Sequence, residues 1–249
     1  GRLPQQRVAA SAPIPAATPA PALPAQPGPL TPPPPSQPTP PAGSAVLLLE
    51  QLGLKRLRPK GRFLLDSYFA NAVQVGREVA GERWPEVAEA AGLPELGSAD
   101  PAGGRQRRTP VEHPSRLVDG FERVYGLHAP DRIREWGRKA ADRWLRLRRK
   151  QRRMPALLKA FTEWMDEVRG EPAHVWRQMD PKQFWLVHYG NLYALGRRQP
   201  EKACFVWTAT YETLLRWAGL ANDWYVEEIE CGCVSGTFDC VFAIRSVKA

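Results

Sequence analysis

The chain has 249 residues, of which 43% are hydrophobic, and a formal net charge of +9 at pH 7. Its length allows one or two domains, and no apolar run approaches the roughly 18 residues of a membrane-spanning helix. The amino end shows no basic stretch followed by an apolar run, the pattern of a secretory signal. We therefore expect a cytoplasmic protein whose thiols stay reduced.

Residues 1–44 consist mainly of Pro, Ala, Gln, Ser and Thr. They include more than half of the 26 prolines, with four in a row at 32–35. Proline removes a backbone donor, and this segment has little to bury, so we predict a disordered linker with polyproline II character. A docking site for a proline-recognition module is one interpretation. A semi-rigid spacer, tethering the rest of the chain to an upstream module, is the simpler one.

Residues 45–170 are predicted to be helical. Apolar residues recur at helical spacing over four stretches, 61–80, 84–91, 114–125 and 156–168. A longer helix is expected to start at Pro130 and to stop before Pro155. The polar residues 96–113 are predicted to form a loop.

The pattern changes to short β-strands with one helix in residues 171–249. Strands are predicted over 174–179, 183–189, 224–231 and 240–247, and a helix over 203–218. The predicted fold class is therefore α+β, with a helical amino-terminal half and a small antiparallel sheet with packed helices in the carboxyl-terminal half. We expect residues 45–249 to form one domain with these two parts.

All four cysteines lie in the last 46 residues. Cys204 is expected at a helix start, Cys231 and Cys233 at the end of one strand, and Cys240 at the start of the next. Converging thiols bind metal, form disulfides or sense redox state. Four cysteines, or three with a carboxylate from the same strand, would give zinc its four ligands. The alternative is that small buried cysteines pack a β core and bind nothing.

The residues around these cysteines resemble the 4-vinyl-reductase-like domain family. The resemblance rests on Cys204, Glu228-Ile-Glu-Cys231, Gly236 and Cys240-Val-Phe-Ala-Ile244, and extends over 45–249. The family occurs in bacteriochlorophyll 4-vinyl reductases and in the sensor domains of aromatic-responsive transcription activators. It implies a structural zinc held by Cys204, Glu228, Cys231 and Cys240. The family spacing differs by one residue, so Cys233 is an alternative ligand.

Aromatic residues crowd the carboxyl-terminal half and indicate an apolar pocket between sheet and helix. Trp185, Trp207 and Tyr211 are the candidate ligand-binding residues, although ordinary core packing also explains aromatic residues of this kind. With the family resemblance, we expect a sensor or carrier domain for a small hydrophobic or aromatic molecule, with zinc as a clasp and no catalytic residue. The alternative is a reductase-type or accessory protein of tetrapyrrole biosynthesis, for which no hydride-cofactor motif is present.

The run 143–153 carries seven positive charges in eleven residues. It could bind nucleic acid or an anionic membrane surface. We interpret it instead as the solvated face of a helix, with arginine stems covering apolar surface, so nucleic acid is not an expected partner. The sequence does not decide whether the chain forms a homodimer.

Overall fold

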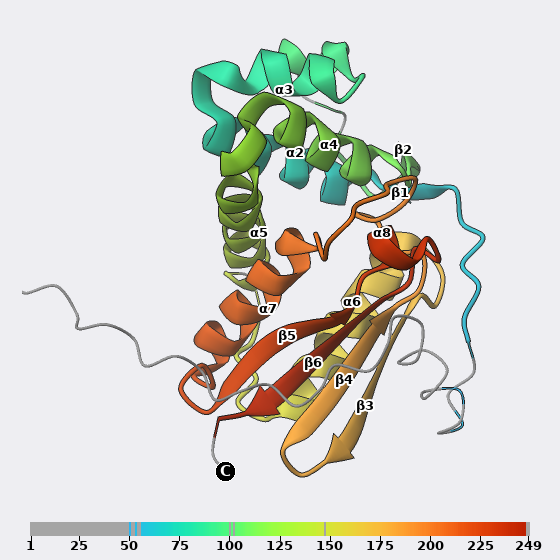
Figure 1. Cartoon of the computed structure of the whole chain (residues 1–249), viewed down its shortest axis with the longest axis vertical. Helices are drawn as coiled ribbons and strands as arrows, with labels where there is room; N and C mark the ends of the chain where they lie inside the picture. The colour runs from blue at the N-terminus through green and yellow to red at the C-terminus, as the bar shows by residue number, and fades with distance from the viewer. Residues whose placement is uncertain are drawn as a thin grey trace, which may run out of the picture. The chain divides into compact units, whose positions relative to one another are not determined.

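The structure is a computed structural model of the chain (Figure 1). It describes Glu50, Gly53 and residues 56–99, 101, 103–146 and 148–247. The linker predicted over 1–44 lies outside the described residues. Within the described part, no helix is both long enough and apolar enough to cross a membrane.

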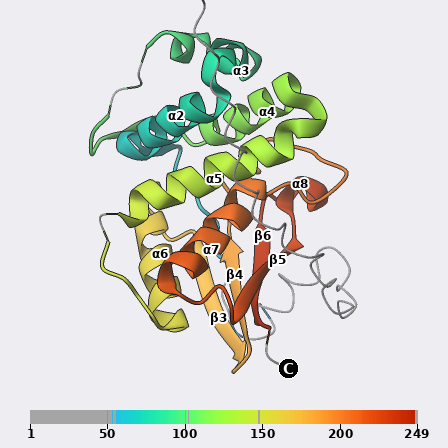
Figure 2. The same cartoon turned by 90° about the vertical axis from the view of Figure 1, so that its left-hand side faces the viewer.

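The amino-terminal half is helical, as the sequence predicts. Its helices are α2 (Asp66–Ala80), α3 (Trp84–Ala90), α4 (His113–Tyr125) and α5 (Ala129–Leu145), with 3₁₀ turns η1 (Gly81–Arg83), η2 (Pro94–Gly97) and η3 (Gly126–His128). Strands β1 (Phe63–Leu65) and β2 (Arg107–Pro110) pair antiparallel beside them. Helix α5 lies between the other amino-terminal helices and the carboxyl-terminal half (Figure 2).

The carboxyl-terminal half is a four-stranded antiparallel sheet with two helices on one face, which confirms the α+β fold class (Figure 1). Its elements are α6 (Met154–Arg169), β3 (His174–Asp180), β4 (Gln183–His188), α7 (Phe205–Ala218), β5 (Trp224–Glu230), α8 (Gly232–Ser235) and β6 (Cys240–Ser246). The strand order is β3-β4-β6-β5. The main core lies between this sheet and helices α6 and α7, because alternate strand residues such as Phe184 and Phe242 face them.

The amino-terminal strand pair is absent from the sequence-based prediction, which has a helix from Gly61 and a loop over 96–113. The buried carboxylate of Asp66 explains the difference. It accepts backbone hydrogen bonds from Arg108 and Thr109, each 3.0 Å long. This contact joins positions about forty residues apart, so no local periodicity indicates it.

The basic run is also placed differently from the prediction. Helix α5 ends at Leu145, and α6 begins at Met154. Most of the run therefore lies in a non-helical connector rather than on a helix face. Like charges at neighbouring positions of a helix destabilise it, and the proline at 155 disfavours helix just before it.

Helix α5 packs against α7 at Gly137. A Cβ added at Gly137 would lie 2.5 Å from the carbonyl oxygen of Val206. We expect Gly137→Ala to lower the free energy of unfolding by about 1–3 kcal/mol, because the two backbones must move apart. Urea denaturation measures this change. Gly103→Ala is the control, since a Cβ there meets nothing within 4 Å, and an equal loss in both variants would contradict the expectation.

Candidate metal centre

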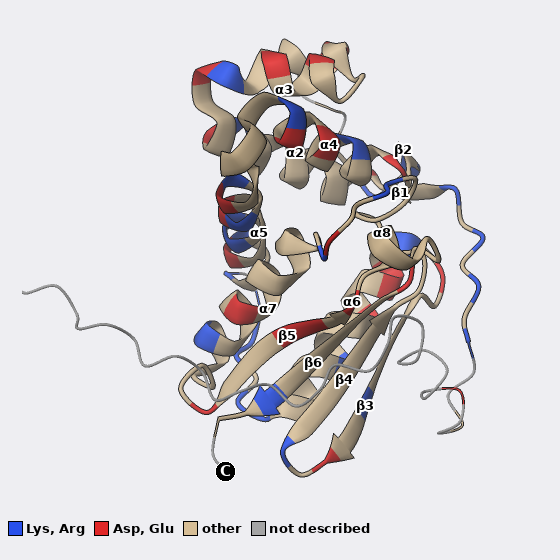
Figure 3. Cartoon of the chain, in the orientation of Figure 1, with Lys and Arg blue, Asp and Glu red and all other residues tan. Residues whose placement is uncertain are grey.

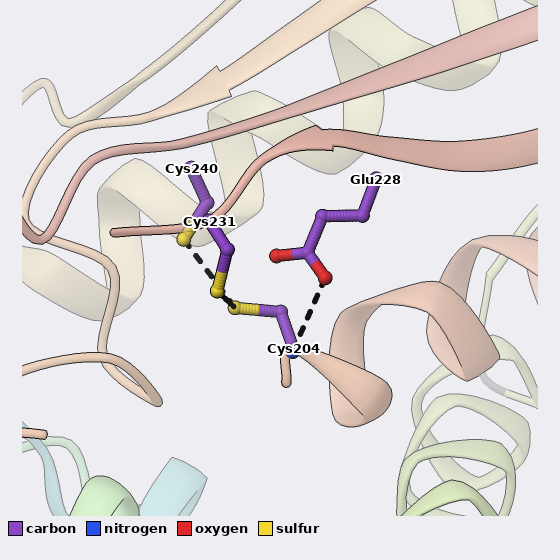
Figure 4. Close-up of side chains that lie close together, drawn as sticks. All are labelled: Cys204, Glu228, Cys231 and Cys240. Atoms are coloured by element: carbon purple, nitrogen blue, oxygen red, sulfur yellow. Dashed lines mark hydrogen bonds between the residues drawn. The ribbon is translucent and has the colours of Figure 1, made fainter. Parts of the chain in front are cut away.

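Three of the four cysteines converge with one glutamate where α7, β5 and β6 meet (Figure 4). The Sγ atom of Cys204 lies 3.7 Å from that of Cys231 and 3.3 Å from that of Cys240. Together with a carboxylate oxygen of Glu228, these sulfur atoms all lie within 4.8 Å of one another. The three cysteines are buried, and none of them forms a disulfide. We call these four residues the cysteine–glutamate cluster.

Local backbone geometry brings the cluster together. Cys204 caps the amino end of α7, and Cys231 caps the short helix α8. The β5–β6 pairing sets Glu228 opposite Phe242, beside an irregularity that lets the end of β5 turn. Strand β5 ends at Glu230, before both cysteines that the sequence places on it.

The structure places Cys231 and Cys233 differently. Cys231 belongs to the cluster, and Cys233, inside α8, does not. Its sulfur lies 3.9 Å from Nη1 of Arg197. The short helix α8 replaces the predicted end of the strand. The Cys233 thiol still contacts the thiols of Cys204 and Cys231, although it is not one of the four residues of the cluster.

Backbone and amide N–H groups surround the cluster. The Gly232 N–H donates to Sγ of Cys240 at 3.2 Å, and Nδ2 of Asn191 donates to Sγ of Cys204 at 3.5 Å. The Cys204 N–H donates to Oε2 of Glu228 at 3.3 Å. Its other oxygen, Oε1, is buried and has no hydrogen-bond partner among the described residues. Such donors favour sulfur as thiolate, and a buried oxygen without a partner favours a cation close by.

The pKa values of the groups in the cluster are shifted in different directions. Contact with the Cys204 thiol, and then with the thiols of Cys233 and Cys240, lowers the pKa of Cys231. Burial raises the pKa of the Cys240 thiol. Burial, and next the charge on Cys231, raise the pKa of Glu228 to about 8. The four groups therefore cannot all be ionised together at neutral pH unless a cation compensates their charge.

A buried arginine connects the surroundings of the cluster to the helical half. Arg197 has 1% of its side chain exposed, and its Nε donates to a carboxylate oxygen of Asp119 at 2.7 Å. Its Nη2 pairs with Glu122. Both acids lie on α4, so Arg197 links α4 to the sulfur of Cys233.

The three candidate ligand-binding aromatics do not line a common pocket. Trp185 lies on the far face of the sheet, in a separate apolar cluster. Trp207 faces α6 and donates from Nε1 to Oδ1 of Asn191 at 2.8 Å, so it holds the amide that contacts Cys204. The hydroxyl of Tyr211 is hydrogen-bonded to Nε2 of His188. The roles of Asn191 and Arg197 were not predicted, because no sequence motif marks either residue.

Comparison with known proteins gives a fold but no family. No protein-family model and no curated protein sequence matches the chain. A solved doubly substituted variant of the Tt H-NOX domain is 12% identical, with a TM-score of 0.50 over 74% of this chain and 95% of that one. A second structure, solved for "Probing the function of heme distortion in the H-NOX family", is 11% identical with the same TM-score and coverage. The fold is that of the H-NOX domains.

The predicted membership of the 4-vinyl-reductase-like family is therefore wrong. The residues behind it, in 203–245, form a helix start beside a β-hairpin in this chain. Both functions drawn from that resemblance are wrong with it, namely the hydrophobic-ligand sensor or carrier and the tetrapyrrole reductase. The expected structural zinc is wrong as well, because a similar structure comes from work on heme in the H-NOX family and a cluster of thiols with a carboxylate does not by itself identify zinc.

Proposed function

We propose that this chain is a metal-responsive sensor domain on the H-NOX fold. In this proposal Cys204, Glu228, Cys231 and Cys240 bind one thiophilic metal ion. The observation that carries it is the convergence of three sulfurs and a carboxylate oxygen within 4.8 Å, with Oε1 of Glu228 buried and unpartnered among the described residues.

The distances suit a tetrahedral ion. Metal–thiolate bonds of about 2.3 Å in tetrahedral geometry separate the ligand atoms by about 3.8 Å. The measured sulfur separations of 3.3 and 3.7 Å are near that value. Soft thiolate donors select thiophilic metals over magnesium or calcium. Four protein ligands leave no position for substrate, so the site fits binding rather than catalysis.

The contacts beyond the cluster support a sensing role. Cys231 caps α8, and Cys233 of the same short helix contacts Arg197, which is bonded to Asp119 and Glu122 of α4. A shift of Cys231 on metal binding would therefore reach α4 through α8 and Arg197. These are contiguous buried contacts, which is what coupling between separated elements needs.

Cobalt titration tests the proposal. Adding Co²⁺ to the reduced chain should produce a sulfur-to-cobalt charge-transfer band that saturates at about one equivalent per chain. The thermal unfolding temperature should rise over the same range, because the ion binds the folded state. A chain that stays folded and shows neither the band nor the rise would contradict the proposal.

Heme is the second candidate, since one of the similar structures was solved in work on heme distortion. The residues present do not fit it. The enclosed space between α2, α5, α6 and α7 measures only about 30 Å³. Sites for small molecules and cofactors span about 300–1,000 Å³. Stacked indoles fill this region, with the ring centroids of Trp144 and Trp164 4.4 Å apart.

The buried histidines do not supply a free axial ligand next to a cavity of heme size. Nδ1 of His174 is bonded to Asp166, and Nε2 of His188 is bonded to Tyr211. We expect hemin titration to give no saturable Soret shift. One heme bound per chain, lost in a His188→Leu variant that remains folded, would overturn this conclusion.

A further inference from the structure

We propose that the segment between α5 and α6 binds single-stranded nucleic acid. This segment, residues 146–153, is named the basic connector and runs from the end of α5 to the start of α6 in Figure 2. Its exposed cations are Arg146, Arg148, Arg149, Lys150, Arg152 and Arg153. It contains no acidic residue.

The cations of the connector differ from those of α5. Acidic and basic residues alternate along α5 (Figure 3), and its cations form pairs such as Lys139 with Glu135 and Arg143 with Glu78. No ion pair joins a cation of the connector to another described residue. A dense group of like charges of this kind fits a polyanion as its partner.

An aromatic slot of about 230 Å³ adjoins these charges. The side chains of Trp144 and Trp217 line it together with Arg148 and Arg149 of the connector. The Arg148 guanidinium lies 5.2 Å from the centre of the Trp144 ring. Nε1 of Trp144 is buried and has no hydrogen-bond partner among the described residues. The slot thus combines indole rings with exposed cations.

This combination matches single-stranded nucleic acid. Proteins bind single strands through cations that contact phosphates and aromatic rings on which bases stack. An irregular connector offers neither the helix nor the β-ribbon that enters a major groove, so duplex DNA fits less well. A membrane surface also fits less well. The large apolar side chains exposed in the described part, such as Phe63, Leu127 and Tyr225, lie elsewhere in the sequence.

Fluorescence anisotropy with a labelled twelve-nucleotide oligouridylate tests the proposal on the full chain. Binding should weaken as the salt concentration rises. A plot of log K against log salt concentration should have a slope of about −0.7 for each phosphate that the protein contacts. Reversing two charges, Arg149→Glu with Lys150→Glu, should weaken binding at least ten-fold at low salt. Trp217→Ala should weaken it about ten-fold, because a stacked base loses its platform.

A matched double variant separates the connector from net charge. Arg138→Glu with Lys182→Glu makes the same charge change on α5 and in the β3–β4 turn, and should leave affinity within about three-fold. Circular dichroism verifies that each variant is folded. Equal losses in both double variants would overturn the proposal. So would binding to phosphatidylserine vesicles or poly-glutamate at least as tight as to the oligonucleotide.

Discussion

Replacing Cys204 by serine is expected to weaken Co²⁺ binding at least 100-fold. Its sulfur lies 3.7 and 3.3 Å from the other two sulfurs of the cluster. Mutation of a residue that only hydrogen-bonds to a metal ligand lowers metal affinity about 10–100-fold. Removal of a thiolate that binds the metal should lower the affinity at least as much. The charge-transfer band of the cobalt complex measures the change.

Cys233→Ser is the matched control. It makes the same substitution in a buried cysteine whose thiol contacts those of Cys204 and Cys231 but is not one of the four proposed ligands. Cobalt affinity should stay within about three-fold of the unchanged chain. If Cys233→Ser abolishes binding and Cys231→Ser does not, the ligand set proposed here is wrong, and Cys233 replaces Cys231 in it.

Helices and strands with regular hydrophobic spacing could be predicted from the sequence. The stripe of Ile133 and Trp136 locates α5, and the alternation along β4 locates a strand. The pair β1–β2 could not be predicted, because it depends on the contact of Asp66 with Arg108. The end of α5 at Leu145 was missed because apolar spacing continues to Leu147, into the basic connector.

The nearness of the cysteines could be predicted from the sequence, but the choice between Cys231 and Cys233, the ion and the family could not. A hairpin with a helix start beside it brings Cys204, Cys231 and Cys240 together in this chain. Because this arrangement covers only a short part of the chain, it led to the wrong family. The fold is decided by the topology of the whole chain. Trp185 was misplaced for a simpler reason. It is an odd number of residues from His188 on one strand, so the two side chains face opposite sides of the sheet.

Trp136→Ala is expected to lower the free energy of unfolding by about 3–5 kcal/mol. Trp136 is 1% exposed and stacks on Phe121, with ring centroids 5.4 Å apart. It packs edge-to-face with Tyr193, with ring centroids 5.7 Å apart, and its Nε1 donates to the carbonyl of Ala72 at 2.9 Å. The substitution removes these contacts from the place where α5 meets α2 and α4. Urea denaturation of the reduced chain measures the loss.

A second variant separates packing from hydrogen bonding. Trp136→Phe keeps an aromatic ring but removes the N–H donor and part of the ring volume, so it should cost less than Trp136→Ala, about 1–3 kcal/mol, with the buried Ala72 carbonyl left without this partner. Tyr225→Ala, at a side chain that is 44% exposed, should change stability by less than about 1 kcal/mol. A loss below about 1 kcal/mol for Trp136→Ala would contradict the expectation.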